Sequence, residues 1–437
     1  MATFLRFLAA TFVALIALVL AAAPRALAQP GALDTSFGTN GTTLIGFGDG
    51  RDESRVVAPL ANGSYLVGGS AGPDLVLVRY LSSGAPDPSF GQRGVARLPN
   101  RYSAVALDLD VQFDGRIVVV GLDLVGPFVT RFLADGAFDP TFGVGGFAEL
   151  SSVPGLSLAA IRVVTGDRIL LAGSINGATA TGSFAVCRLT PSGALDPAFD
   201  GDGLQSTTIP NGGSATSMTI QSDGKIVLAG RANNAGSGSS LALVRYTAAG
   251  ALDTSFDGDG RVITTIVSAT ASSFANAVVT QAVSGNADKL LVAGSTTVSP
   301  ANREGVLARY NLNGTLDATF GSGGVVVQAI STGDDDFRAL RFVPGADRTQ
   351  PSRIFVGGYA SSPTSQRNVL LCSYGITGSL NTGFSGDGIV VETIGTSQNE
   401  AASMAFTGER LLVTGLATQG TEGQNFMLAR FLASNGA

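Results

Sequence analysis

The chain has 437 residues, contains no His and no Trp, has two Cys and carries a formal net charge of −6. Without an imidazole it cannot run Ser-His-Asp or Cys-His catalysis, and it cannot build the common zinc sites that contain His. The acidic balance, with no long run of basic residues, disfavours nucleic-acid binding.

Residues 1 to 28 have the pattern of a secretory signal peptide. Arg6 precedes an apolar stretch over residues 7 to 23, and the small-residue signature Ala26-Leu27-Ala28 follows it. We expect cleavage after Ala28, a secreted or periplasmic location and no stable membrane span in the mature chain. The alternative is an uncleaved membrane anchor, because about 17 apolar residues lie at the lower limit of what spans a bilayer.

The remainder of the chain, residues 29 to 437, is predicted to form a single domain made of seven copies of one repeated unit. The segment Gly-x-Leu-Asp-x-x-Phe-Gly-x-x-Gly occurs seven times, as in GALDTSFGTNG, GAFDPTFGVGG and GTLDATFGSGG. Its marker Phe is at positions 37, 90, 142, 199, 256, 320 and 384. A period of this length indicates a repeat architecture in which each unit is one supersecondary element.

Each unit contains four apolar runs separated by Gly-rich breaks. The clearest copy reads SMTIQSDG, KIVLAG, LALVRY and RVITTIV, over residues 217 to 267. Short runs rich in Val, Ile and Leu, with an Asp-Gly break, are typical of antiparallel strands and hairpins. Seven units of four strands predict an all-β, seven-bladed β-propeller.

The order of segments at the two ends of the chain predicts how the ring closes. The chain enters the repeat in mid-unit at Gly31, and it stops where the next copy of that segment would begin. We expect the strand over residues 41 to 47 to complete the last blade, beside strands from residues 401 to 432. This arrangement leaves no open interface between the terminal blades.

The combination DGKIVLAG, LVRY and GALDTSFDGDG resembles the delta-60 repeat family of bacterial secreted and surface β-propellers. The resemblance covers nearly the whole mature chain and departs from the pattern mainly in unit six, which has LCSY and GSLN. It implies a propeller and export, and it implies no particular reaction.

The residues that recur in every unit have structural explanations. The marker Phe is expected to pack in the core, because burying each one contributes roughly 1.5 to 3 kcal/mol. The recurrent Asp suits an Asx turn, since Asn381 replaces it in unit six. Because Ser373 replaces the recurrent Arg in the same unit, we expect these Arg–Asp contacts: Arg79 with Asp87, Arg131 with Asp139, Arg188 with Asp196, Arg245 with Asp253, Arg309 with Asp317, and Arg430 with Asp34. Cys187 and Cys372 occupy equivalent positions and are expected to be buried and unpaired.

Three loops that precede the first strands of consecutive blades are acidic. Their carboxylates are Asp49, Asp52 and Glu53, then Asp334, Asp335 and Asp336, and finally Glu400. Together they suit a hard cation such as Ca²⁺ near one mouth of the central channel. The alternative is a solvated acidic rim, in which Arg55 neutralises Asp52 and Arg338 neutralises Asp335.

These observations favour a binding or scaffolding module whose partner is another protein or a surface polymer, with no cofactor other than a Ca²⁺ ion. The alternative is a Ca²⁺-dependent hydrolase or lactonase in which the acidic cluster activates water. Residue patterns alone do not identify a substrate or an oligomeric state.

Overall fold

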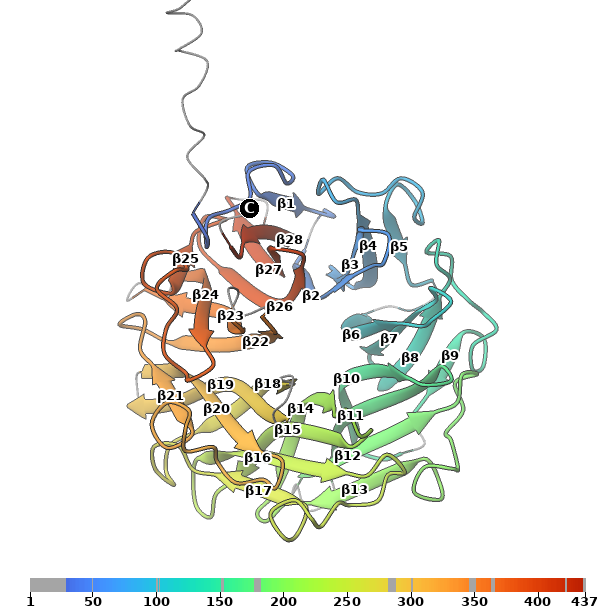
Figure 1. The fold of residues 1–437 in the computed structure, drawn as a ribbon. Helices are drawn as coiled ribbons and strands as arrows, with labels where there is room; N and C mark the ends of the chain where they lie inside the picture. The colour runs from blue at the N-terminus through green and yellow to red at the C-terminus, as the bar shows by residue number, and fades with distance from the viewer. Residues whose placement is uncertain are drawn as a thin grey trace, which may run out of the picture.

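Seven four-stranded antiparallel sheets surround a central axis in this computed structural model (Figure 1). The structure describes residues 29–48, 50–99, 101, 103–150, 153–176, 182–281, 288–299, 302–345, 351–362, 366–420 and 423–434. No helix in that part of the chain is long and apolar enough to cross a membrane. The seven four-stranded sheets confirm the predicted seven-bladed β-propeller. The proposed signal peptide lies outside the described residues.

Each blade takes four strands, and the first of the four is the innermost. Blade one is formed by β2 (Asp52–Pro59), β3 (Tyr65–Ala71), β4 (Asp74–Tyr80) and β5 (Val95–Arg97). Blade two is formed by β6 (Val105–Val111), β7 (Ile117–Leu122), β8 (Pro127–Phe132) and β9 (Phe147–Glu149). Blade three is formed by β10 (Leu156–Val164), β11 (Arg168–Asn176), β12 (Gly182–Leu189) and β13 (Leu204–Thr208). Blades four and five are formed by β14 (Gly213–Ile220), β15 (Ile226–Asn233), β16 (Ser239–Tyr246) and β17 (Arg261–Thr264); and β18 (Ser273–Gln281), β19 (Lys289–Ser299), β20 (Asn302–Asn311) and β21 (Val325–Gln328). Blade six is formed by β22 (Asp335–Val343), β23 (Arg353–Ser361), β24 (Arg367–Gly375) and β25 (Ile389–Glu392), and blade seven by β26 (Asn399–Thr407), β27 (Arg410–Gln419), β28 (Gly423–Leu432) and β1 (Thr42–Ile45).

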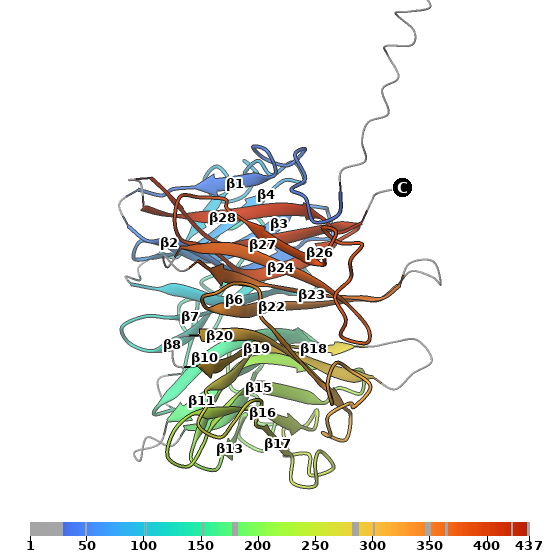
Figure 2. The same ribbon diagram turned by 90° about the vertical axis from the view of Figure 1, so that its left-hand side faces the viewer.

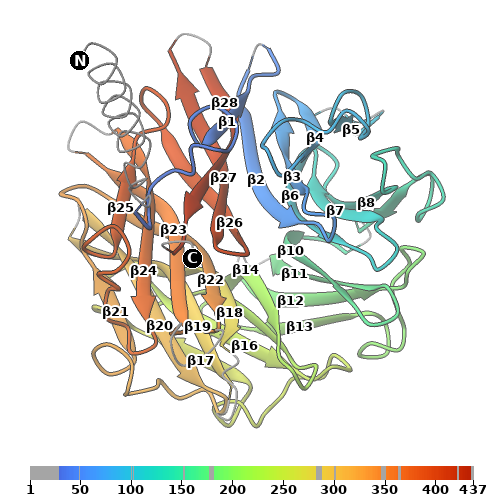
Figure 3. The same ribbon diagram turned by 45° about the horizontal axis from the view of Figure 1, so that its top comes forward.

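The N-terminal strand β1 closes the ring, as expected. It pairs antiparallel with β28, with Thr42 opposite Ala429. Backbone hydrogen bonds extend the contact on both sides, from Gly31 N to Leu432 O at 2.7 Å and from Arg430 N to Gly41 O at 2.9 Å. Figure 3 shows β1 beside β28, with β2 of the first blade as the next strand around the ring. The two ends of the chain thus hold one sheet together.

The hydrophobic core lies between neighbouring blades, which stack side by side around the ring (Figure 2). One cluster, for example, joins Phe184 and Phe199 of unit three to Leu228 and Tyr246 of blade four. All seven marker Phe side chains are at most 1% exposed, which confirms the packing role. Because each blade contacts only its two neighbours, the core is continuous only when the ring is closed.

A β-bulge interrupts every inner strand, and the Gly that ends the recurrent apolar run of the second strand lies opposite it. In blade four the register of β14 shifts between Ala215 and Ser217, facing Gly230. A Cβ at Gly230 would lie 1.9 Å from the carbonyl oxygen of Ser214, so no other residue fits without a backbone shift. In five of the other six blades, a Cβ on the equivalent Gly would likewise lie 1.8 to 2.0 Å from a carbonyl oxygen of the inner strand. A bulge re-aims the extra residue, and here it turns side chains of the inner strands toward the axis.

Candidate functional site

The recurrent Arg and Asp form salt bridges in six units. The Arg Nε lies 2.7 to 3.0 Å from one carboxylate oxygen of the Asp in all of them. The other carboxylate oxygen accepts the backbone N–H two residues later, which is an Asx turn. Both oxygens of each Asp are thus engaged within the fold, including those of Asp34 at the ring closure.

The same Arg also connects its unit to the next blade. Its Nη1 donates to a carbonyl oxygen of the following unit, for example from Arg79 to Ala134 at 2.7 Å and from Arg430 to Ser82 at 2.6 Å. The guanidinium carbon lies 4.5 to 4.8 Å from the centre of the marker Phe ring in the same six units. Each of these Arg side chains contacts the recurrent Asp, the marker Phe ring and a backbone carbonyl of the next blade, so its role is structural.

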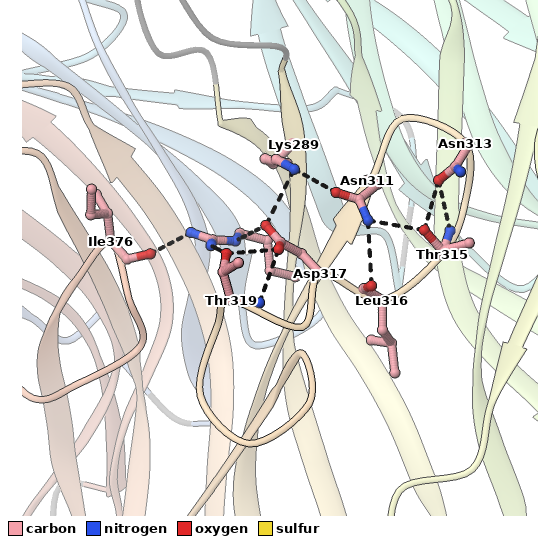
Figure 4. A network of polar contacts seen from close by, with 9 residues as sticks. Lys289, Asn311, Asn313, Thr315, Leu316, Asp317, Thr319 and Ile376 are labelled. Atoms are coloured by element: carbon pink, nitrogen blue, oxygen red, sulfur yellow. Dashed lines mark hydrogen bonds and ion pairs between the residues drawn. The ribbon is translucent and has the colours of Figure 1, made fainter.

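Figure 4 shows this arrangement around Asp317 in unit five. Asp317 accepts from Arg309 Nε at 2.9 Å, lies 3.3 Å from Lys289 Nζ, and accepts from the Thr319 hydroxyl at 2.8 Å. Burial alone would raise its pKa. The hydrogen bonds from Thr319 and the charge of Arg309 outweigh burial and lower the pKa of Asp317 to about 2.

The two Cys residues are also structural. Cys187 and Cys372 are free and completely buried, as expected. Burial raises the pKa of the Cys187 thiol to about 12 and raises that of Cys372 as well. A buried thiol with a raised pKa is a poor nucleophile.

The acidic residues proposed as a rim or a cation site are mostly buried and bind backbone groups. Asp52 is 2% exposed and accepts from the N–H groups of Phe47 at 2.7 Å and Gly72 at 3.0 Å. Asp335 is completely buried and accepts from the N–H groups of Ile330 and Ser331. In blade seven Asn399 occupies the same register and accepts from Gly395 N at 2.6 Å. Because the neutral amide of Asn399 accepts the same kind of hydrogen bond, this position requires an acceptor oxygen and not a negative charge.

The expected pairs Arg55–Asp52 and Arg338–Asp335 are wrong. Arg55 lies 3.4 Å from Glu53, and Arg338 lies 3.4 Å from Asp336. Arg55 and Arg338 are the extra residues at the bulges of β2 and β22, and a bulge re-aims its extra side chain. Asp52 and Asp335 bind backbone N–H groups instead.

Arginines hold the remaining acidic side chains. Arg338 connects Asp336 with Glu400 of the next blade, and Arg367 also contacts Glu400. Asp334 accepts from the N–H of Arg303 at 3.0 Å. Asp49 lies outside the described residues. Within the described ranges no group of three or more Cys, Asp or Glu side chains lies close enough to hold a metal ion.

A cavity of about 430 Å³ lies on the axis of the ring, and residues from all seven inner strands line it. We call it the central channel. Its charged side chains are Arg55, Asp108, Asp110, Arg162, Arg338 and Arg341. Its volume is within the range of small-molecule sites, which are about 300 to 1,000 Å³.

The two acidic side chains of the channel bind the neighbouring blade. Asp108 on β6 accepts from Arg162 Nη1 at 2.7 Å and from the N–H of Ile161 at 3.1 Å, both on β10. Asp110 accepts from the N–H of Val163 at 2.7 Å. Burial raises the pKa of Asp110 despite this hydrogen bond. These contacts join blades two and three.

Arg341 on β22 has a different environment. Its Nη1 donates to the carbonyl of Leu340 at 2.9 Å, and no described carboxylate lies within ion-pair distance of its guanidinium. Burial, with a smaller effect from the nearby charge of Arg162, lowers the pKa of Arg341 to about 10, although Asp108 opposes the shift. Arg341 therefore remains protonated near neutral pH without a direct ion-pair partner among the described residues.

The sequence pattern indicated Arg55 and Arg338 only as partners of loop carboxylates, and it did not indicate Asp108, Asp110, Arg162 or Arg341. The available signal was the pattern of the inner strands, because Asp108-Leu109-Asp110 and Arg338-Ala339-Leu340-Arg341 place charges in segments that are central in a propeller. Such charges are rare inside sheets unless they are paired or face a polar cavity.

Comparison with family models supports the resemblance described above. The model described as "Domain of unknown function (DUF5122) beta-propeller" matches residues 60–90, 112–142, 167–199, 221–256 and 288–320. Each matched segment ends at or near a marker Phe, so the model describes the repeat itself. No curated protein sequence matches the chain at a significant level.

Solved structures of similar shape have little sequence identity. The polysaccharide lyase Uly1 gives a TM-score of 0.50 at 10% identity, over 94% of this chain and 96% of that one. Drosophila plexin A, solved in complex with semaphorin 1b, gives 0.48 at 9% identity, over 92% and 87%. Virginiamycin B lyase from Staphylococcus aureus gives 0.46 at 12% identity, over 89% and 98%. At these identities the likeness concerns the fold alone.

Proposed function

We propose that this chain, five segments of which match the DUF5122 model of a β-propeller of unknown function, is an exported binding module. In this proposal a rigid ring presents the central channel to a surface polymer outside the cytoplasm. The family supplies no reaction, so the proposal depends on the geometry of the site.

The observation that carries the proposal is the contrast between the recurrent residues and the channel. The recurrent Arg, Asp and Phe are fully engaged inside and between blades. The channel, in contrast, brings non-repeated polar and charged side chains from all seven blades into one cavity. Residues that differ between copies at one place on a repeated scaffold are the ones free to define a ligand.

The size of the channel favours a polymer over a protein partner. A cavity of about 430 Å³ admits a small group or the end of a chain. A stable protein interface buries about 1,200 to 2,000 Å² of surface and is formed by broad faces rather than by a narrow cavity.

The contacts of the acidic side chains favour binding over the alternative of Ca²⁺-dependent hydrolysis. Asp52 and Asp335 accept backbone N–H groups, and Glu400 is held by two Arg side chains. A Ca²⁺ site uses six to eight oxygen ligands. Recruiting these carboxylates would break hydrogen bonds that organise the loops.

Electrophoresis of the mature protein, residues 29 to 437, through native gels that contain a polymer tests the proposal. The gels would contain neutral dextran, dextran sulfate or polygalacturonate. Ala402→Trp partly fills the channel, and Ile263→Trp on β17 is the matched control at a site that is 44% exposed. We expect at least one polymer to retard the wild type and the control but not Ala402→Trp. Equal retardation of all three proteins, or no retardation in any gel, would contradict the proposal.

A further inference from the structure

Arg162 and Arg341 line the same central cavity, and the charge of Arg162 acts on Arg341. They belong to β10 and β22, which lie on opposite sides of the central opening in Figure 1. Like charges in a partly desolvated cavity repel each other, and salt screens this repulsion only weakly.

The two acidic groups that face this pair equal it in number of charges, but the contacts of both with the neighbouring blade lie on β10, on the Arg162 side of the channel. Asp108 is shared between Arg162 and the N–H of Ile161, and Asp110 is bound to the N–H of Val163. The remaining cations of the channel have partners near its wall, since Arg55 pairs with Glu53 and Arg338 with Asp336 and Glu400. Arg341 is thus the channel cation for which the described residues supply no carboxylate within ion-pair distance.

Neutral hydrogen-bond donors share the cavity with these two cations. Ser217 and Thr219 line it from β14, between β10 and β22. Thr216 and Asn276 also line it, but the Thr216 hydroxyl already donates to the Ala275 carbonyl and the Asn276 amide to Asp336 and Phe337. A guanidinium offers several N–H donors in a fixed fork, which matches the oxygens of carboxylate, sulfate and phosphate. Together these groups have the donor set of an oxyanion site.

We propose that the central channel binds an oxyanion group of the ligand, a carboxylate or a sulfate or phosphate ester, between Arg162 and Arg341. This inference rests on the proposed function and adds the chemical class of the polymer, which is acidic. The bound anion supplies the direct ion-pair partner that the described residues do not give Arg341.

The proposal predicts an unusual combination of stability and binding. Arg341→Gln removes a desolvated cation and its repulsion with Arg162, so the empty variant should melt at the same temperature as the wild type or higher. The same variant should bind oxyanions at least about tenfold more weakly, because hydrogen bonds to charged groups are the strong ones. A merely structural Arg would show the reverse, with lower stability and unchanged binding.

Thermal melting of the mature protein in sodium sulfate, sodium phosphate or sodium acetate, against sodium chloride at equal ionic strength, tests this inference. A ligand that binds only the folded protein raises the melting temperature. Sulfate and phosphate also stabilise proteins without binding them, so the readout is the rise in the wild type beyond that in Arg341→Gln. A larger response to acetate indicates a carboxylate group, and a larger response to sulfate or phosphate indicates an ester.

Arg97→Gln is the matched control, because Arg97 pairs with Asp74 on the exposed outer part of blade one. It should keep the full response. If Arg341→Gln does not fold, Arg341→Lys keeps the charge without the fork and should show a weaker response than the wild type. An equal rise in the wild type and in the Arg341 variant would overturn the inference.

The two proposals fail separately. Oxyanion binding without retardation by any polymer contradicts the proposed function alone. Retardation by a polymer that Arg341→Gln leaves unchanged contradicts this inference alone.

Discussion

Arg353 donates a hydrogen bond of 2.6 Å from its Nη1 to the carbonyl oxygen of Ala433. In the other units the equivalent carbonyl accepts from the recurrent Arg of the preceding unit, as Ala134 does from Arg79. Unit six has Ser373 at that Arg position, and Arg353 at the start of β23 replaces it. The connection between blades six and seven is thus kept by a residue from a different strand.

Arg353→Ala should therefore destabilise the ring. We expect the free energy of unfolding in urea to fall by about 1 to 2 kcal/mol, which is typical for a partly buried hydrogen bond from a charged donor. The control is Arg97→Ala, whose exposed ion pair should contribute less than about 1 kcal/mol. Equal losses in the two variants would mean that the contact between Arg353 and Ala433 has no special role.

Two adjacent glycines of β23 should respond in opposite ways to the same substitution. A Cβ at Gly358 would lie 1.8 Å from the carbonyl oxygen of Asp336 at the bulge, whereas a Cβ at Gly357 meets its nearest atom at 3.4 Å. Gly358→Ala should lower the free energy of unfolding by at least about 2 kcal/mol, because the backbone must move. Gly357→Ala should be neutral or stabilising by up to about 1 kcal/mol. Similar urea midpoints for both variants would refute the role assigned to the bulge.

The recurrent Asp residues predict acid sensitivity. Hydrogen bonds and nearby Arg charges lower the pKa of Asp34, Asp87, Asp139, Asp196, Asp253 and Asp317, although burial opposes the shift. A carboxyl group whose pKa is lower in the folded state contributes its full stability above the unfolded pKa of about 3.9, and it loses that stability as the pH falls through the folded value.

Melting temperature should accordingly fall between about pH 4 and pH 2, the interval between the unfolded pKa and the folded pKa of Asp317. Asp317→Asn removes one of the groups that titrate and should show a shallower fall over the same interval. A wild-type melting temperature that stays constant from pH 4 to pH 2 would show that these salt bridges do not stabilise the fold.

Calcium should have little effect on the protein. Because Asp52, Asp335 and Glu400 bind backbone and Arg groups, we expect the same melting temperature with Ca²⁺ and with a chelator. A rise with Ca²⁺ that Asp335→Asn abolishes would restore the metal site proposed from the sequence.

Much of the architecture could be predicted from repetition. The Asx turn, the marker Phe and the Gly opposite the bulge recur because each blade has the same backbone geometry. Comparison of the seven copies therefore shows which residue type each position requires. The replacement of Arg and Asp together by Ser373 and Asn381 is an example, since the structure retains a 3.2 Å hydrogen bond between the two new side chains.

The channel could not be predicted in this way, because its residues are the ones that do not repeat. Arg341, Arg162 and Asp110 occupy the same register in their blades, but the bulge before them changes which side chains face the axis. The acidic loops were misjudged for a related reason. Their sequence shows the charge of Asp52 and Asp335, whereas their role depends on backbone N–H groups that the loops turn inward.

Oxyanion binding in the central channel is tested most directly by a crystal structure of residues 29 to 437 soaked in selenate, an oxyanion that anomalous X-ray scattering locates. We expect a selenium peak in the central channel, with the selenate oxygens within hydrogen-bond distance of the Arg341 and Arg162 guanidinium groups. The peak should be absent from Arg341→Gln crystals soaked in the same way. A channel without selenium in the wild type, or a peak that survives the substitution, would contradict oxyanion binding between these two residues.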